Sequence, residues 1–180
     1  MSAAAWRNRP GVVNDMIRDA GYWIRGLQLV PHPEGGHYRE TYRASETVTR
    51  AALPSRFPGD RCFATSIYYL LQGGEVSTFH RIRSDELWYH HDGAAIVIHV
   101  IDPEGRYRAL RLGRDMGAGE APQAVVSAGS WFGATVEGGF ALAGCSVAPG
   151  FDFADFELAR RDALLEEFPE CGDIILKLTR

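Results

Sequence analysis

Cysteine is scarce in this 180-residue chain, and long apolar runs are missing. The three cysteines, Cys62, Cys145 and Cys171, are an odd number at wide spacing without a C-x-x-C pair. This pattern argues against a disulfide framework and a zinc ribbon, so we expect free thiols in a reducing compartment. The first ten residues lack a long apolar segment, and the longest apolar run, residues 94–100, is interrupted by His99. The sequence therefore predicts a soluble, cytoplasmic protein that does not cross a membrane.

An excess of positive charge is also missing. The chain carries 19 Lys and Arg against 23 Asp and Glu, a formal net charge of -4, and the two signs are interspersed. Nucleic-acid binding requires a clustered positive surface, so we expect no nucleic-acid partner. A glycine-rich helix start beside a Lys/Arg cluster is absent too, which argues against a P-loop nucleotide site. The expected partner is a small molecule.

Turn residues divide most of the chain into short segments. A length of 180 residues suits one core, and we expect a single domain over residues 1–180. Residues 27–157 show short apolar or alternating runs between glycine-rich turns, which is typical of a β-sandwich or barrel. The sharpest turn, residues 102–105, has proline second and glycine fourth, and it joins residues 96–101 to residues 107–112 as a hairpin.

Helical patterns flank this strand-rich region. A short N-terminal helix is expected over about residues 12–21. Gly21, in the left-handed conformation, is expected to end it. Near the other end, apolar residues at helical spacing predict a helix over about residues 156–168, ended by Pro169. Residues 174–178 carry a weaker pattern that suggests a last strand.

A histidine and a glutamate lie six residues apart in the strand-turn-strand segment of residues 74–93. Side chains alternate faces in a strand, so Glu86 shares a face with Trp88 and His90, while His80 lies on the preceding strand. If both strands direct these side chains into a barrel, one cavity holds an imidazole and a carboxylate. Such a pair can bind a metal, act as an acid–base couple or clamp a polar ligand.

The chain resembles the cupin superfamily and, more narrowly, the cupin_5 family, also described as DUF985. The resemblance covers about residues 27–157. It is carried by the spacing within residues 74–93 and by these strings: residues 31–36 (Pro-His-Pro-Glu-Gly-Gly), 38–42 (Tyr-Arg-Glu-Thr-Tyr), 65–70 (Thr-Ser-Ile-Tyr-Tyr-Leu), 79–80 (Phe-His), 84–88 (Ser-Asp-Glu-Leu-Trp) and 144–153 (Gly-Cys-Ser-Val-Ala-Pro-Gly-Phe-Asp-Phe). It implies an all-β double-stranded β-helix, the jelly-roll barrel, with the two short helices outside and a homodimer through an outer sheet.

The two metal-binding motifs that this resemblance implies are incomplete. Ile82 stands where the first motif carries its second histidine, and Phe132 stands where the second motif carries its histidine. Two of the four usual ligands remain, whereas catalytic transition-metal sites normally need three protein ligands, so we expect no cofactor. The alternative is a divalent metal held by a non-standard set: His80, Glu86 and either His90 or His37.

Without a metal, the resemblance implies the chemistry of metal-free epimerases, in which a histidine removes a proton next to a carbonyl group. His80 is the expected base, because its unperturbed pKa of about 6.5 suits proton transfer at neutral pH. Glu86 is its expected partner. A tyrosine is expected to supply the acid: Tyr68, with Tyr38 and Tyr42 as alternatives, because the strand register decides which of them faces inward.

Further residues are expected to contact the ligand. Trp88 and Phe132 form an aromatic wall suited to a sugar ring, or equally to core packing. Glu34 lies in a glycine-rich turn at the barrel mouth, where its role is ligand contact or turn structure. Arg39 binds a carboxylate or phosphate, or else lies on a solvated face. His90 adjoins Trp88 on the same face.

These interpretations lead to one leading function and two alternatives. We expect binding of a small polar or sugar-like metabolite, such as a sugar or sugar nucleotide, in the barrel, with metal-independent epimerase or isomerase activity. The alternatives are a non-catalytic binding protein and a metal-dependent cupin enzyme. We assign no chemistry to Cys145 or to the cluster Phe151, Phe153 and Phe156, which we expect to anchor the C-terminal segment across the barrel.

Overall fold

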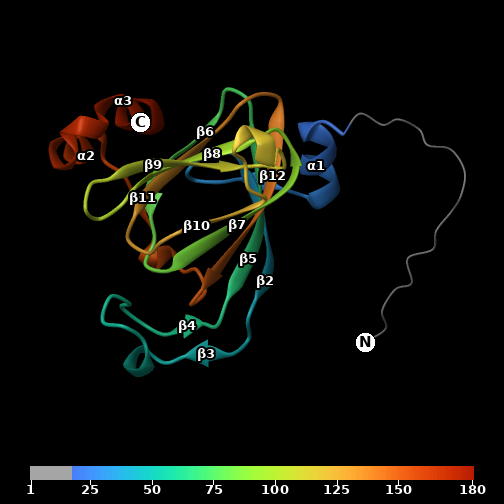
Figure 1. Cartoon of the computed structure of the whole chain (residues 1–180). Coiled ribbons are helices and arrows are strands. Elements are labelled where there is room, and N and C mark those ends of the chain that lie inside the picture. Colours follow the sequence, from blue (N-terminus) through green and yellow to red (C-terminus); the bar gives the residue numbers. More distant parts are fainter. Residues whose placement is uncertain (1–17) are drawn as a thin grey trace, which may run out of the picture.

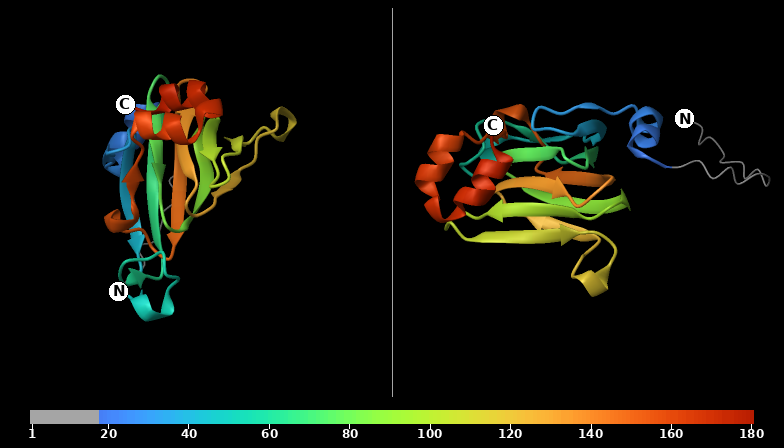
Figure 2. Two further views of the ribbon diagram at one scale, coloured as in Figure 1. Left: turned by 90° about the vertical axis from the view of Figure 1, so that its left-hand side faces the viewer. Right: turned by 90° about the horizontal axis from the view of Figure 1, so that it is seen from above.

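Two antiparallel β-sheets lie face to face in the computed structural model, which describes residues 18–180 (Figures 1 and 2). The six-stranded sheet has the order β1 (Val30–Pro31), β2 (His37–Arg43), β5 (Thr65–Gln72), β12 (Phe140–Ala148), β7 (Asp85–Gly93) and β10 (Gln123–Val126). The five-stranded sheet has the order β13 (Glu157–Leu158), β6 (Val76–Arg81), β11 (Trp131–Val136), β8 (Ile96–Ile101) and β9 (Tyr107–Leu112). A two-stranded ribbon, β3 (Thr47–Val48) and β4 (Arg61–Cys62), extends from one end. The predicted jelly-roll class is confirmed.

Alternation along the strands explains the core. Tyr69 and Leu71 of β5 point into the space between the sheets, where they join Trp88, Ile98 and Phe132 in the main buried cluster. The hairpin predicted for residues 96–101 and 107–112 is present as β8 and β9, with Ile98 opposite Leu110. The turn between them has proline and glycine at the positions expected from the sequence.

The N-terminal helix, α1 (Ala20–Leu27), begins and ends later than predicted. Asp19 caps it by accepting the Tyr22 backbone N–H at 2.7 Å, and Gln28 ends it in the left-handed conformation. Gly21 lies in its first turn, so the prediction that Gly21 ends the helix is wrong; residues 12–17 of that prediction lie outside the described residues. The helix continues because an apolar stripe packs against β5 and β12: Trp23, Ile24 and Leu27.

The C-terminal segment also differs from the prediction. Residues 157–158 form β13, which pairs with β6 at the edge of the five-stranded sheet, so the helix α2 (Arg161–Glu167) begins later than expected. Pro169 opens the 3-10 helix η4 (Pro169–Cys171). The strand suggested for residues 174–178 is wrong, because α3 (Gly172–Leu178) is helical there. Its residues Ile175 and Leu178 are buried three positions apart against the outer face of the five-stranded sheet, as helical spacing requires.

Besides η4, three short 3-10 helices lie in the connections of the described residues: η1 (Arg50–Ala52), η2 (Met116–Ala118) and η3 (Phe153–Asp155). No helix within residues 18–180 is long and apolar enough to span a membrane.

Candidate functional site

A cavity of about 290 Å³ opens between the two sheets at the end where η3 lies. Its apolar wall consists of Ile67, Ile82, Trp88, Val147, Phe151, Phe153 and Phe156. Its polar and titratable lining consists of His32, Glu34, Tyr38, Glu40, Arg43, Thr65, Tyr69, His80, Glu86 and Cys145. A cavity whose apolar wall surrounds convergent polar groups is the usual form of a small-molecule site.

Opposite walls of the cavity carry the two residues of the sequence motif. His80 lies near the end of β6 in the five-stranded sheet, and Glu86 lies near the start of β7 in the six-stranded sheet. Trp88, two residues beyond Glu86, lines the same wall as Glu86 and is buried. The structure therefore brings His80, Glu86 and Trp88 to one cavity, as the alternation of side chains predicts.

His80 is fixed in one orientation by its surroundings. Its Nδ1 lies 2.8 Å from the Thr78 carbonyl oxygen, and since a carbonyl only accepts, Nδ1 carries the proton that it donates. Its Nε2 then lies 3.1 Å from Oε2 of Glu34. The rings of Phe132 and Phe156 pack on the imidazole at centroid distances of 4.0 and 5.4 Å. Burial lowers the pKa of His80 to about 4.

Glu34 is the buried partner of that imidazole. Ser77 donates its hydroxyl to Oε1 at 2.9 Å, and His32 Nδ1 lies 3.6 Å from Oε2. Burial raises the pKa of Glu34, and the contacts with His32 and Ser77 oppose this shift. Because neutral His80 has no proton on Nε2, a proton taken up by the pair can be shared between Nε2 and Oε2. Glu34 and His80 therefore titrate as a pair.

Glu86 is a second buried carboxyl group of the cavity. Burial, reinforced by the charge of Glu34, raises the pKa of Glu86 to about 8. The Cys145 thiol opposes that shift, and its own pKa is raised well above the usual value by burial. At neutral pH the Glu86 carboxyl group is mostly protonated, and it can donate a hydrogen bond or a proton. Two carboxyl groups in one cavity thus have different roles available to them.

Several predicted site residues lie outside the cavity lining. Tyr68 points to the outer face of β5, where it contacts His91 and the residues under α1, because its neighbour Tyr69 takes the inward position. Arg39 pairs with Tyr68 across β2 and β5 and shares its outward side. Tyr68, expected to supply the acid, and Arg39, expected to bind a carboxylate or phosphate or to lie on a solvated face, therefore do not line this cavity.

The histidines proposed as extra metal ligands are also separate from the site. Nε2 of His90 lies 3.0 Å from the Ala94 carbonyl oxygen, near a bulge where β7 shifts register against β12. His37 lies at the start of β2, outside the cavity lining. Phe132 does not line the cavity either, but it supports His80 from behind.

Three features of the site were not predicted. His32 lines the cavity beside Tyr38, with ring centroids 4.5 Å apart. Tyr69 donates its hydroxyl to the Gly35 carbonyl oxygen at 2.9 Å, and burial raises its pKa well above the usual value. The phenylalanines of residues 151–156 form the outer cover of the cavity, whereas the sequence suggested only an anchoring role. For Tyr69, the sequence offered one signal, the adjacent tyrosines Tyr68 and Tyr69 in one strand. The strand register decides which of the two faces the cavity.

The residues present do not fit the metal that the cupin resemblance implies. Within residues 18–180, no group of three or more His, Cys, Asp or Glu side chains is placed to hold a metal ion. Ile82 and Phe132 put apolar groups at two of the usual ligand positions, and His80 already engages Thr78 and Glu34. The alternative set of His80, Glu86 and His90 is not brought together.

The turn that carries Glu34 requires glycine. Thr78 donates its backbone N–H and its hydroxyl to the Glu34 carbonyl oxygen, at 2.9 and 2.8 Å, which draws the turn against β6. Gly35 has a φ of +117°, and a Cβ there would lie 2.1 Å from the Val76 carbonyl oxygen. We expect Gly35→Ala to lower the free energy of unfolding by roughly 2–4 kcal/mol, through strain and displacement of the turn. Urea denaturation measures this loss.

Gly74→Ala is the matched control, because Gly74 has a φ of +88° but no atom within 4 Å of the added Cβ. Only the conformational strain, roughly 1–3 kcal/mol, applies there. Equal losses in the two variants would show that the close approach to β6 contributes nothing.

Comparison with known proteins places the chain in one family. The family model described as "Cupin superfamily (DUF985)" matches residues 21–159. The uncharacterized protein YML079W of Saccharomyces cerevisiae is 29% identical over 144 residues, which cover 73% of this chain and 71% of that protein.

Comparison with solved structures supports the same family assignment. Protein SO0799 from Shewanella oneidensis has a TM-score of 0.83 and 42% identity, covering 91% of this chain and 99% of that one. A hypothetical protein from Leishmania major has a TM-score of 0.81 and 34% identity, covering 89% of this chain and 98% of that one. Oxalate decarboxylase from Bacillus subtilis has a TM-score of 0.51 and 17% identity, covering 82% of this chain and 36% of that one, a likeness of fold alone.

Proposed function

Because this chain belongs to the DUF985 family of the cupin superfamily, whose barrel here encloses titratable groups on opposite walls, we propose that it binds a small carbonyl compound, such as a sugar, and moves protons on it without a metal. The observation that carries the proposal is that one cavity brings together the Glu34–His80 contact and a second buried carboxyl group, Glu86. Environments that push the pKa values of neighbouring groups apart separate an acid from a base.

The size and charge of the cavity limit what its interior can accept. A volume of about 290 Å³ lies at the lower end of ligand pockets, which supports a monosaccharide-sized group inside the barrel. Arg43 is the one guanidinium among the described residues of the lining, and Glu40 pairs with it at 2.6 Å. An anionic group would find no unpaired cation inside, so the reacting part of the ligand is neutral.

The proposed step conserves the charge of the cavity. The Glu34–His80 pair, without its shared proton, removes a proton from the carbon next to the carbonyl group. The electron pair of that C–H bond forms the C=C bond of an enol, while Glu86 gives its proton to the carbonyl oxygen. The pair gains one proton and Glu86 loses one. The buried site therefore never accumulates charge, which would be costly in this apolar wall.

Reprotonation decides the product. A proton returned to the other face of the same carbon gives an epimer, and a proton returned to the neighbouring carbon gives an isomer. Because His80 belongs to the five-stranded sheet and Glu86 to the six-stranded sheet, the substrate lies between two proton-carrying walls. This arrangement supports an epimerase or isomerase over a reaction that needs one face only.

Solvent deuterium exchange tests the proposal. In D₂O, the wild-type protein is expected to exchange the hydrogen next to the carbonyl of an aldose or ketose from a panel of sugars, as followed by proton NMR. His80→Asn and Glu86→Gln are each expected to slow this exchange by about 100-fold or more, since each removes one proton carrier.

Tyr68→Phe is the control, because Tyr68 faces away from the cavity, and its exchange rate is expected to match the wild type. Exchange that survives His80→Asn at the wild-type rate would contradict the assignment of the base. Sugars that bind without any exchange in the wild type would instead support a non-catalytic binding protein.

A further inference from the structure

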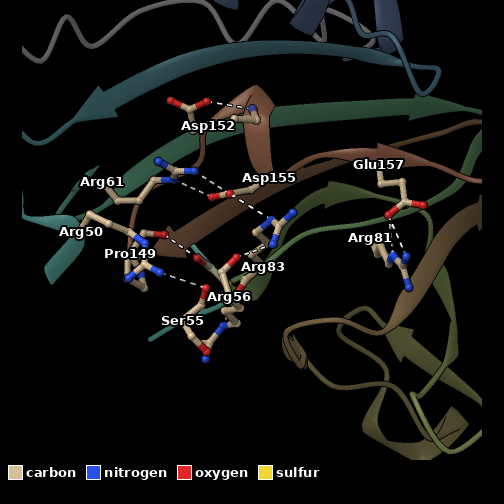
Figure 3. A network of polar contacts seen from close by, with 12 residues as sticks. Arg50, Ser55, Arg56, Arg61, Arg81, Arg83, Pro149, Asp152, Asp155 and Glu157 are labelled. Carbon is tan, nitrogen blue, oxygen red and sulfur yellow. Dashed lines mark hydrogen bonds and ion pairs between the residues drawn. The ribbon is translucent and has the colours of Figure 1, made fainter. Parts of the chain in front are cut away.

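A second depression lies directly beside the barrel mouth. It has a volume of about 420 Å³ and shares Ile82 and Phe156 with the cavity as a common wall. We call it the arginine groove, because its charged lining consists of Arg56, Arg81, Arg83, Asp155 and Glu157. Figure 3 shows Arg56, Arg61 and Arg83 gathered near Asp155, while Arg81 and Glu157 face each other farther along.

Two of the arginines lack a close carboxylate partner of their own among the described residues. Asp155 is held by Arg61, which contacts both of its carboxylate oxygens at 2.6 Å from behind the groove. Arg81 is held by Glu157 at 2.8 Å. Arg83 reaches the occupied Asp155 only at 3.4 Å, and Arg56 has no carboxylate partner among residues 18–180. The carboxylates of two further neighbours accept backbone N–H groups instead: Asp60 from Arg50 and Asp152 from Ala154.

Reciprocal hydrogen bonds hold these two like charges together. Nε of Arg56 donates to the Arg83 carbonyl oxygen at 2.7 Å, and Nη1 of Arg83 donates to the Arg56 carbonyl oxygen. Arg56 also lies over the ring of Phe57, 4.9 Å from its centroid. Each guanidinium is thus anchored through one edge, and its remaining N–H donors can contact a ligand. Two anchored guanidiniums lose little entropy when they bind an anion, which favours phosphate binding.

We propose that the arginine groove binds the phosphate group of the ligand whose neutral end enters the barrel, so that the substrate is a phosphorylated sugar or a sugar diphosphate. This inference rests on the proposed function for the barrel end only. Among residues 18–180 no unpaired cation lines the cavity, whereas the adjoining groove is lined by three arginines. A phosphate monoester carries about two negative charges, which match Arg56 and Arg83, whereas a carboxylate carries one.

The test uses inorganic pyrophosphate as the probe, with titration calorimetry on the full chain at low salt. We expect the wild type to bind it, and Arg56→Gln and Arg83→Gln each to weaken binding by about tenfold or more, because each removes charged hydrogen bonds. Arg39→Gln is the control, since Arg39 lies on the far side of β2, and its affinity is expected to equal that of the wild type. Thermal denaturation verifies that each variant is folded.

A second titration compares a sugar phosphate with the same free sugar. The phosphate is expected to raise affinity in the wild type, and Arg56→Gln is expected to erase this difference. Absence of pyrophosphate binding in the wild type, or equal weakening by Arg39→Gln, would contradict the proposal that the arginine groove binds phosphate. The deuterium-exchange test of the barrel would be unaffected by that result. The protein could instead bind pyrophosphate through Arg56 and catalyse no hydrogen exchange on any sugar. That result would support the anion site and contradict the proposed enzymatic activity.

Discussion

Asp155→Ala is expected to lower the free energy of unfolding by about 3–5 kcal/mol, because it leaves the guanidinium of Arg61 buried without its counter-charge. Arg61 and Asp155 are 5% and 6% exposed, and two contacts at 2.6 Å join them (Figure 3). Removing one member of such a pair costs more than the pair itself contributes, since the remaining charge cannot reach water. Urea denaturation at neutral pH measures the loss.

Two further variants show whether burial is the cause. Glu157→Ala breaks the ion pair with Arg81, which is of similar length but exposed, and is expected to cost at most about 1 kcal/mol. Arg61→Met combined with Asp155→Ala removes both charges, and it is expected to be more stable than Asp155→Ala alone. Equal losses in Asp155→Ala and Glu157→Ala would show that the Arg61–Asp155 pair has no special role.

The same pair links the fold to the site. Asp155 belongs to η3, between Phe153 and Phe156, and these two phenylalanines cover the cavity. Arg61 belongs to β4, in the ribbon that extends below the barrel. Arg43 adds a hydrogen bond to the Phe151 carbonyl oxygen at 3.0 Å. The cover is therefore held in place by ionic contacts, and its loosening in Asp155→Ala is expected to weaken ligand binding as well as stability.

Local patterns in the sequence predicted the strands well, because alternation and turn chemistry act over a few residues. The hairpin of residues 96–101 and 107–112 follows from one turn, and the inward positions of His80, Glu86 and Trp88 follow from a period of two. None of these inferences requires knowledge of distant contacts.

The errors arose where a distant contact decided the outcome. Tyr68 and Tyr69 are equivalent in sequence, and pairing with β2 and β12 chose Tyr69 for the interior. His90 keeps the register of Trp88, but it lies farther along β7, where its Nε2 meets the Ala94 carbonyl oxygen outside the cavity lining. Glu34 was recognised as a turn residue, but its contact with His80 spans 46 positions of the chain and has no local signature. Folding onto β5 and β12 extended α1 past Gly21.

Glu86→Gln is expected to reduce the decline in stability between pH 5 and pH 8. In the unfolded chain Glu86 ionises near pH 4.5, whereas in the folded protein burial raises its pKa to about 8. Between these values the folded state keeps a proton that the unfolded state has lost, so rising pH favours unfolding. The difference corresponds to roughly 5 kcal/mol at most, fully developed above pH 8.

The variant separates this effect from other titrations. Glutamine keeps the shape and a hydrogen-bond donor but cannot ionise, so Glu86→Gln is expected to match the wild type near pH 4 and to exceed its stability increasingly up to pH 9. Other titrating groups contribute to both proteins and largely cancel in the difference. Glu166→Gln, on the exposed face of α2, is the control and is expected to leave the profile unchanged. A wild-type profile that stays parallel to that of Glu86→Gln would show that Glu86 is ionised in the folded state. It would then lack the proton that the proposed reaction needs, because an ionised carboxylate can only accept.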